Sequence, residues 1–171
     1  MTKQKLYLFV GYPGAGKTTV ARRIADKTGA DHIWADRERQ RMFVNPTHSK
    51  VESRQLYTLL DGKTEQLLNQ GHSVVFDTNF NYRADRELLR AIADRHDAET
   101  IVIWMTTPKK TAKQRALNHT HRERNGYVTS MSEEEFENLS DHLEEPSKEE
   151  NPIKIDGSVI NLDYIDQLLG L

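Results

Sequence analysis

Short apolar runs alternate with amphipathic segments along most of the chain. Runs of strand length cover residues 6–10, 32–35, 73–76 and 100–105. Between them, apolar residues recur at helical spacing, over residues 18–28, 51–70 and the stretch after Asn81. Strands that alternate with helices predict a parallel sheet covered by helices on both faces, with right-handed crossovers. The 171 residues are enough for one well-cored α/β domain, residues 1–171.

Capping residues refine these boundaries. Gly29 is a plausible end for the first helix, and Asn81 a natural N-cap for the third. Ser132 begins an acidic helix with a capping-box pattern, which Pro146 would close. The remaining predicted elements are a basic helix at 109–117, a strand at 153–155 and a helix at 162–169. Residues 108–145 would form an excursion, or lid, over the open end of the sheet.

A glycine-rich loop follows the first predicted strand. Residues 11–18 read Gly-Tyr-Pro-Gly-Ala-Gly-Lys-Thr, which fills every fixed position of the phosphate-binding loop. Glycines allow backbone N–H groups to approach phosphates, Lys17 can reach the β- and γ-phosphates, and the Thr18 hydroxyl can bind Mg²⁺. A ligand-free glycine turn is the alternative, but the order strand, loop, helix favours nucleotide binding. The predicted nucleotide-binding residues are Gly11, Pro13, Gly14, Ala15, Gly16, Lys17, Thr18 and Thr19.

Two carboxylates stand at the ends of the next two strands. Asp36 and Asp77 should face the same crevice, since ligands of open α/β sheets bind beyond the carboxyl ends of strands. One could accept a proton from an attacking hydroxyl while the other holds the metal, and the two roles are interchangeable at this stage. Each could instead simply cap the helix that follows. Thr78, where motor-type ATPases commonly have Glu, speaks against a motor.

Composition excludes several classes of function. The net charge of −2 gives no general attraction for nucleic acid, although one local groove could still hold a strand. The chain has no cysteine, so disulfides, thiolate metal sites and cysteine nucleophiles are excluded. No apolar run is long enough for a signal peptide or membrane span. A soluble, cytoplasmic protein without a membrane partner is expected.

Three motifs together resemble a known family. The motifs are the loop with its following Thr19, the segment Ala35-Asp36-Arg37-Glu38-Arg39 and the segment Asp77-Thr78-Asn79-Phe80-Asn81. Together they resemble the kinase domain of bacteriophage-type polynucleotide 5′-kinase. They are also similar to small bacterial P-loop kinases such as zeta-toxin-like proteins. The resemblance runs to Glu145-Pro146 and implies a P-loop NTPase three-layer sandwich with a helical lid, using ATP and Mg²⁺.

The resemblance also implies roles for individual residues. Asp36 matches the general base, and Arg39 matches the arginine that grips a phosphate on the acceptor. Asp77 and Asn79 would lie on the substrate side, with Asp77 positioning groups or metal-bound water. Thr18 and Asp77 are the expected metal-binding residues.

Lid arginines would stabilise the charge that develops during transfer. The candidates are Arg115, Arg122 and Arg124. The family's second lid arginine aligns with His119, so Arg122 or Arg124 could replace it. His119 and His121 fit a mobile pair in the lid better than a metal site, for which only Glu123 is suitably spaced.

The predicted activity is an ATP- and Mg²⁺-dependent transfer of the γ-phosphate to a hydroxyl acceptor. A polynucleotide 5′-hydroxyl is the leading acceptor, because it follows from the nearest resemblance. A small molecule, such as a sugar, a nucleotide-sugar or an antibiotic, is the alternative. An ATP-hydrolysing switch that binds a partner protein is a third hypothesis.

Overall fold

A five-stranded parallel sheet forms the centre of the computed structural model, which describes residues 3–118, 123–124, 127–128 and 131–171. Its strands are β1 (Lys5–Val10), β2 (Asp31–Trp34), β3 (Val74–Asp77), β4 (Glu99–Met105) and β7 (Ile153–Ile155). They lie in the order β2-β3-β1-β4-β7, with every pairing parallel. This is the predicted α/β P-loop architecture.

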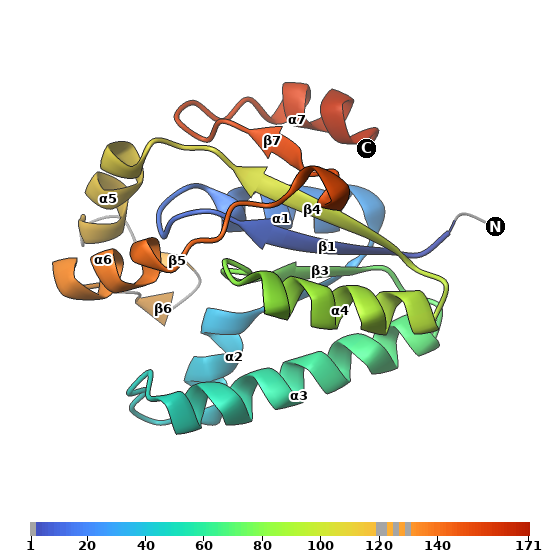
Figure 1. Ribbon diagram of the computed structural model, residues 1–171, viewed down its shortest axis with the longest axis horizontal. Coiled ribbons are helices and arrows are strands. Elements are labelled where there is room, and N and C mark those ends of the chain that lie inside the picture. Colours follow the sequence, from blue (N-terminus) through green and yellow to red (C-terminus); the bar gives the residue numbers. More distant parts are fainter. Residues whose placement is uncertain (1–2, 119–122, 125–126, 129–130) are drawn as a thin grey trace.

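Helices cover both faces of the sheet (Figure 1). Helices α1 (Lys17–Thr28) and α7 (Leu162–Leu169) pack on one face, where Phe9 and Val75 are fully buried. Helices α3 (Lys50–Asn69) and α4 (Arg83–Arg95) pack on the other, against Leu8 and Phe76. Because both faces are covered, β1 is apolar at nearly every position rather than alternating. None of the described helices is long and apolar enough to cross a membrane.

The segment predicted as a lid leaves the sheet at the end to which the strands point (Figure 1). It contains α5 (Lys109–Leu117), a short antiparallel pair of β5 (Glu123–Arg124) with β6 (Tyr127–Val128), and α6 (Glu133–Asp141). The capping box at Ser132 is confirmed. Helix α6 ends at Asp141, earlier than the predicted stop at Pro146, and an irregular segment leads on to the 3₁₀ turn η2 (Lys148–Glu150).

Buried polar bonds explain why the chain after α6 is not helical. The backbone N–H of Glu144 donates to the carbonyl of Asn81, and Arg86 of α4 pairs with Glu150 through two bonds of 2.6 and 3.0 Å. Arg86 is only 1% exposed. These contacts tie the segment to α4 in an extended path, which a continued helix could not follow.

Two local predictions differ from the structure. Strand β2 ends at Trp34, and α2 (Ala35–Met42) begins at once, so Asp36 lies in the first turn of a helix rather than at a strand end. The helical pattern was hidden because the buried positions of α2 are Ala35 and a charged residue, Arg39. The N-cap of α4 is Tyr82, not Asn81, because the Asn81 side chain binds the backbone of Gly11 instead.

Candidate active site

The glycine-rich loop turns through backbone conformations that favour glycine. Gly14 and Gly16 have φ angles of 80° and 102°, in the left-handed region. A Cβ atom on Gly14 would lie 2.3 Å from the carbonyl oxygen of Ala112, because α5 packs directly on the loop. Gly16 then occupies the N-cap position of α1. The loop therefore leads to a helix N-terminus, where backbone N–H groups and the helix dipole favour an anion.

Lys17 folds back over the loop. Its ammonium nitrogen donates to the carbonyl oxygens of Gly11 at 3.0 Å and Tyr12 at 2.6 Å. The side chain is buried, with 8% of the residue exposed. The positive charge is thus held at the loop, where the β- and γ-phosphates of a nucleotide would lie.

Two residues that the sequence did not identify as functional hold the loop in shape. Asn81 accepts from the Gly11 N–H at 3.1 Å and donates to the Gly11 carbonyl at 3.3 Å. Thr107 donates its hydroxyl to the Ala15 carbonyl at 2.8 Å and accepts from the Gly157 N–H at 3.0 Å. Asn81 belongs to a motif that the sequence did single out, but its partner could not be read there. Thr107 carries no sequence signal.

Asp77 lies beside the loop threonine, Thr18. Its Oδ1 accepts from the Thr18 hydroxyl at 3.2 Å, and its Oδ2 lies 3.1 Å from His32 Nε2. Asp77 is 3% exposed. Thr18 and Asp77 thus offer adjacent oxygen atoms, which are the ligands that Mg²⁺ prefers.

Asp36 differs from Asp77 in its surroundings. The residue is exposed to solvent, yet protein atoms around the carboxyl desolvate it and raise its pKa above the ordinary value of 3.8. The negative charge of Asp77 raises the pKa further, while His48, Arg39 and Lys17 partly offset the rise. The structure therefore brings Asp36, Asp77 and Lys17 into one electrostatically coupled group. A carboxylate with a raised pKa binds a proton more readily than an ordinary one.

Arg39 is buried and held by neighbouring polar groups. Its Nη1 pairs with Glu52 at 2.5 Å, and its Nη2 donates to Ser53 at 3.3 Å. The Glu52 carboxylate also accepts from the backbone and hydroxyl of Thr47. These bonds outweigh desolvation and lower the pKa of Glu52 to about 2. These bonds to Glu52 and Ser53 use two of the five N–H donors of the Arg39 guanidinium group.

The side-chain oxygen of Asn79, Oδ1, is buried and has no hydrogen-bond partner within the described residues. Buried polar atoms are nearly always paired, with protein, water or ligand. The neighbouring Thr78 hydroxyl, in contrast, lies 2.7 Å from the hydroxyl of Tyr57 on α3.

Only one of the three candidate lid arginines has a described side chain. Arg115 donates to the carbonyl oxygens of Gly157 and Ser158, both at 2.6 Å, and so connects α5 to the loop before α7. Arg122, His119 and His121 lie outside the described residues. Arg124 belongs to β5, but its side chain also lies outside what the structure describes. The roles of these arginines stay predictions.

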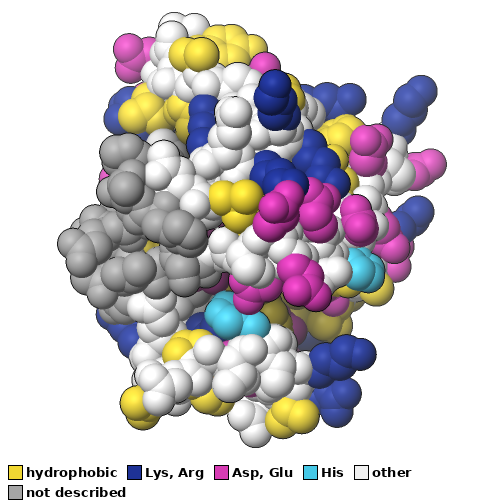
Figure 2. All heavy atoms as spheres, turned by 90° about the vertical axis from the view of Figure 1, so that its left-hand side faces the viewer, with side chains coloured by type: hydrophobic (Ala, Val, Ile, Leu, Met, Phe, Trp, Pro, Cys, Tyr) yellow, Lys and Arg dark blue, Asp and Glu magenta, His cyan; other side chains and the backbone are white. Residues whose placement is uncertain are grey.

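The face at the carboxyl end of the sheet carries many acidic side chains over α6 and the segment after it (Figure 2). The exposed acidic residues there are Glu133, Glu134, Glu135, Asp141, Glu144 and Glu145. Lys109 and Lys113 of α5 pair with Glu133, Glu137 and Asp141 of α6, at 2.5 to 3.6 Å. The positive charges of Lys109 and Lys113 are therefore neutralised by the carboxylates of α6.

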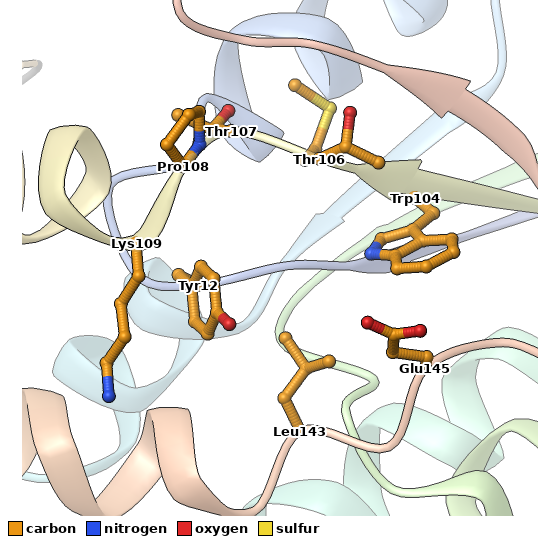
Figure 3. A pocket seen from close by; sticks show the side chains of 9 residues that line it. Tyr12, Trp104, Thr106, Thr107, Pro108, Lys109, Leu143 and Glu145 are labelled. Carbon is orange, nitrogen blue, oxygen red and sulfur yellow. The ribbon is translucent and has the colours of Figure 1, made fainter.

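A pocket of about 280 Å³ opens beside the loop (Figure 3). Tyr12 of the loop, Trp104 at the end of β4 and Glu145 after α6 are among the residues that line it. Lys154 Nζ lies 4.7 Å from the centre of the Trp104 ring. Trp104 thus lies at a pocket wall near the edge of the sheet, whereas Trp34 is buried.

Solved structures share this fold across the whole chain. A protein of Chloroflexus aurantiacus provisionally assigned as a kinase is 20% identical, with a TM-score of 0.76, over 99% of this chain and 96% of that one. The APS kinase CysC of Mycobacterium tuberculosis, in complex with AMPPNP and APS, is 16% identical with a TM-score of 0.68, over 100% of both chains. Shikimate kinase of Acinetobacter baumannii, in complex with shikimate, is 20% identical with a TM-score of 0.61, over 98% and 92%.

The comparisons of sequence gave two results. No curated protein matches the sequence. A protein family described as "AAA domain" matches residues 6–146, which include the loop, Asp36, Asp77 and the lid segment. Since this match spans most of the chain, the protein belongs to that AAA-domain family.

Proposed function

We propose that the protein is an ATP- and Mg²⁺-dependent phosphotransferase that moves the γ-phosphate of ATP to a hydroxyl group of an acceptor. The observation that carries this proposal is the grouping of Lys17, Thr18, Asp77 and Asp36 at one end of the sheet. A phosphate loop alone would indicate only nucleotide binding. A carboxylate with a raised pKa, exposed beside that loop, adds the group that a hydroxyl acceptor needs.

The surroundings of the two aspartates separate their roles. Asp77 is nearly inaccessible, and both of its oxygens are engaged, by Thr18 and His32. Asp36 is exposed and its pKa is raised, so it is the better proton acceptor. In this assignment the oxygen of the acceptor hydroxyl attacks the γ-phosphorus while Asp36 takes the proton of that hydroxyl. ADP is the leaving group.

The remaining roles follow from position. Lys17 and the loop N–H groups would hold the β- and γ-phosphates, and Thr18 with Asp77 would hold Mg²⁺, directly or through water. The bound metal would neutralise charge on the phosphates. Arg39 and Asn79 would contact the acceptor, since Arg39 keeps further donors and Asn79 Oδ1 has no described partner. We place the lid in residues 108–145 of a single domain, with Arg115, Arg122 or Arg124 supplying charge during transfer.

We favour a small-molecule alcohol as the acceptor over a polynucleotide. The acidic face formed by α6 and the segment after it would repel a polyanion that crossed it (Figure 2). Two of the similar structures named above contain small molecules, APS in one and shikimate in the other. A polynucleotide 5′-hydroxyl remains the second candidate, because the segments around Asp36 and Asp77 resemble polynucleotide kinases.

An acceptor screen tests the proposal. The protein is incubated with γ-labelled ATP and Mg²⁺, together with 5′-hydroxyl DNA, 5′-hydroxyl RNA or pooled small metabolites. We expect label in an organic acceptor from the metabolite pool, and none when Lys17→Ala replaces the wild type. Label in the oligonucleotides would instead favour the polynucleotide reading. Release of free phosphate alone, across the whole panel, would contradict a kinase and favour an ATP-hydrolysing switch.

A further inference from the structure

His32 lies beside the candidate metal site and has no role in the proposed reaction so far. It belongs to β2, which pairs with β3 so that His32 is opposite Val75 and Trp34 is opposite Asp77. Side chains two residues apart on a strand point to the same face, so His32 and Asp77 are diagonal neighbours on one face of the sheet. The side chain of His32 is 16% exposed, and its Nε2 lies 3.1 Å from Asp77 Oδ2.

The chemistry of the pair fixes which atom donates. An ionised carboxylate only accepts hydrogen bonds, so the proton of this bond belongs to His32 Nε2. The other oxygen, Oδ1, accepts from the Thr18 hydroxyl at 3.2 Å. With one donor on each oxygen, the carboxylate of Asp77 cannot rotate without breaking a bond. Because the Thr18 proton points to Asp77, the lone pairs of the Thr18 oxygen are left for a cation.

We propose that His32 is a positioning residue for the metal site. It holds Asp77 in the orientation that keeps the Thr18 oxygen directed at the Mg²⁺ of the bound nucleotide. The inference rests on the proposed function, because it requires Mg²⁺ and ATP to bind at this loop. Residues that orient metal ligands in this way typically change metal affinity 10- to 100-fold when replaced.

A purely structural histidine–aspartate pair offers a matched control. His72 Nδ1, just before β3, lies 2.7 Å from Asp31 Oδ2, at the start of β2. Both side chains of that pair are about half exposed, and neither is near the loop. Replacing His72 removes the same kind of histidine–aspartate contact to β2 but leaves Asp77 untouched.

The test measures binding of a fluorescent ATP analogue, without any acceptor and so without turnover. Wild type, His32→Ala, His32→Gln and His72→Ala are each titrated with Mg²⁺, and the affinity without Mg²⁺ is measured in EDTA. Mg²⁺ should raise the affinity for the ATP analogue, and we expect His32→Ala to need about tenfold more Mg²⁺ for half of this increase. Its affinity for the analogue in EDTA should equal that of the wild type. His32→Gln, whose amide can still donate to Asp77, should recover most of the loss. Thermal unfolding of each variant shows whether it is folded.

Two results would overturn the inference while the proposed function stands. One is an unchanged Mg²⁺ requirement in His32→Ala; the other is an equal shift in His72→Ala. If His32→Ala does not fold, His32→Leu takes its place. An unaltered Mg²⁺ requirement in His32→Leu, or a requirement in His32→Gln as high as that of His32→Leu, then counts against the inference in the same way. If the wild type binds no ATP analogue at any Mg²⁺ concentration, the proposed function fails and the inference fails with it.

Discussion

At the scale of single residues, two carboxylates of the site region show how surroundings set acidity. Asp36 has a raised pKa, because protein atoms desolvate it and Asp77 repels its charge. Glu52 has a pKa lowered to about 2, because Arg39 and the Thr47–His48 backbone donate to it. The first is suited to accept a proton, and the second to remain charged beside Arg39.

The lowered pKa of Glu52 predicts how stability depends on pH. The pKa is about 2 in the folded protein against 4.5 for an ordinary glutamate, so the folded state favours the ionised form. The contribution of this group to stability is therefore complete above about pH 4.5 and is lost as the pH falls toward 2. We expect Glu52→Gln to lower the free energy of unfolding at pH 6, by an amount that shrinks steadily between pH 4.5 and pH 3.

Urea unfolding of both proteins across this pH range measures the difference. Glu134→Gln, at an exposed position of α6, is the matched control and should leave the free energy of unfolding almost unchanged throughout. A difference for Glu52→Gln that stays constant down to pH 3 would show that the charge of Glu52 does not matter.

At the scale of secondary-structure elements, the site depends on how closely α5 approaches the glycine-rich loop. The backbone of Ala112 occupies the space that a side chain on Gly14 would need. Thr107 and Arg115 then connect the loop and α5 to the turn before α7. Helix α5 and the glycine-rich loop are therefore one packed unit.

A pair of glycine substitutions separates backbone strain from this packing. Gly14 and Gly29 have similar φ angles of 80° and 72°, but a Cβ atom on Gly29 would meet nothing within 4 Å. Both alanine variants carry the cost of a left-handed residue, on the order of 1–2 kcal/mol. We expect Gly14→Ala also to weaken binding of an ATP analogue at least tenfold, because the loop or α5 must move.

The Gly29→Ala variant should bind the analogue like the wild type, measured at a temperature where both variants are folded. Equal affinities for the two variants would contradict the close packing of α5 on the loop.

The elements that the sequence predicted well are those whose signal is local. Residues 11–18 are recognisable from spacing alone, and the strands before Gly11 and Asp77 are recognisable from apolar runs. Helix α2 was missed because one of its two buried positions is occupied by a charged residue, Arg39. An apolar residue there would have shown the helical spacing from Ala35. Asn81 was interpreted as a helix cap, since nothing local shows that β3 and β1 are neighbours and bring it to Gly11.

In the molecule as a whole, the candidate site forms where chain segments far apart in sequence meet at the carboxyl ends of the strands. The order β2-β3-β1 places α2, the segment after β3 and the glycine-rich loop side by side (Figure 1). The chain after α6 is fixed to α4 by the buried pair of Arg86 with Glu150. Sequence motifs predicted which segments would meet, but the coupling of Asp36 to Asp77, and of Asp77 to His32, required the three-dimensional arrangement.

Replacement of Asp36 tests whether this carboxylate is the general base of phosphate transfer. With an acceptor from the screen, γ-phosphate transfer is measured for wild type and Asp36→Asn, alongside binding of an ATP analogue. Asp31→Asn, at the other end of β2, serves as the control and should transfer phosphate like the wild type. We expect Asp36→Asn to slow transfer by about 100-fold or more, as is typical for loss of a general base, while ATP affinity changes less than about twofold. Transfer by Asp36→Asn at the wild-type rate would show that Asp36 is not the general base.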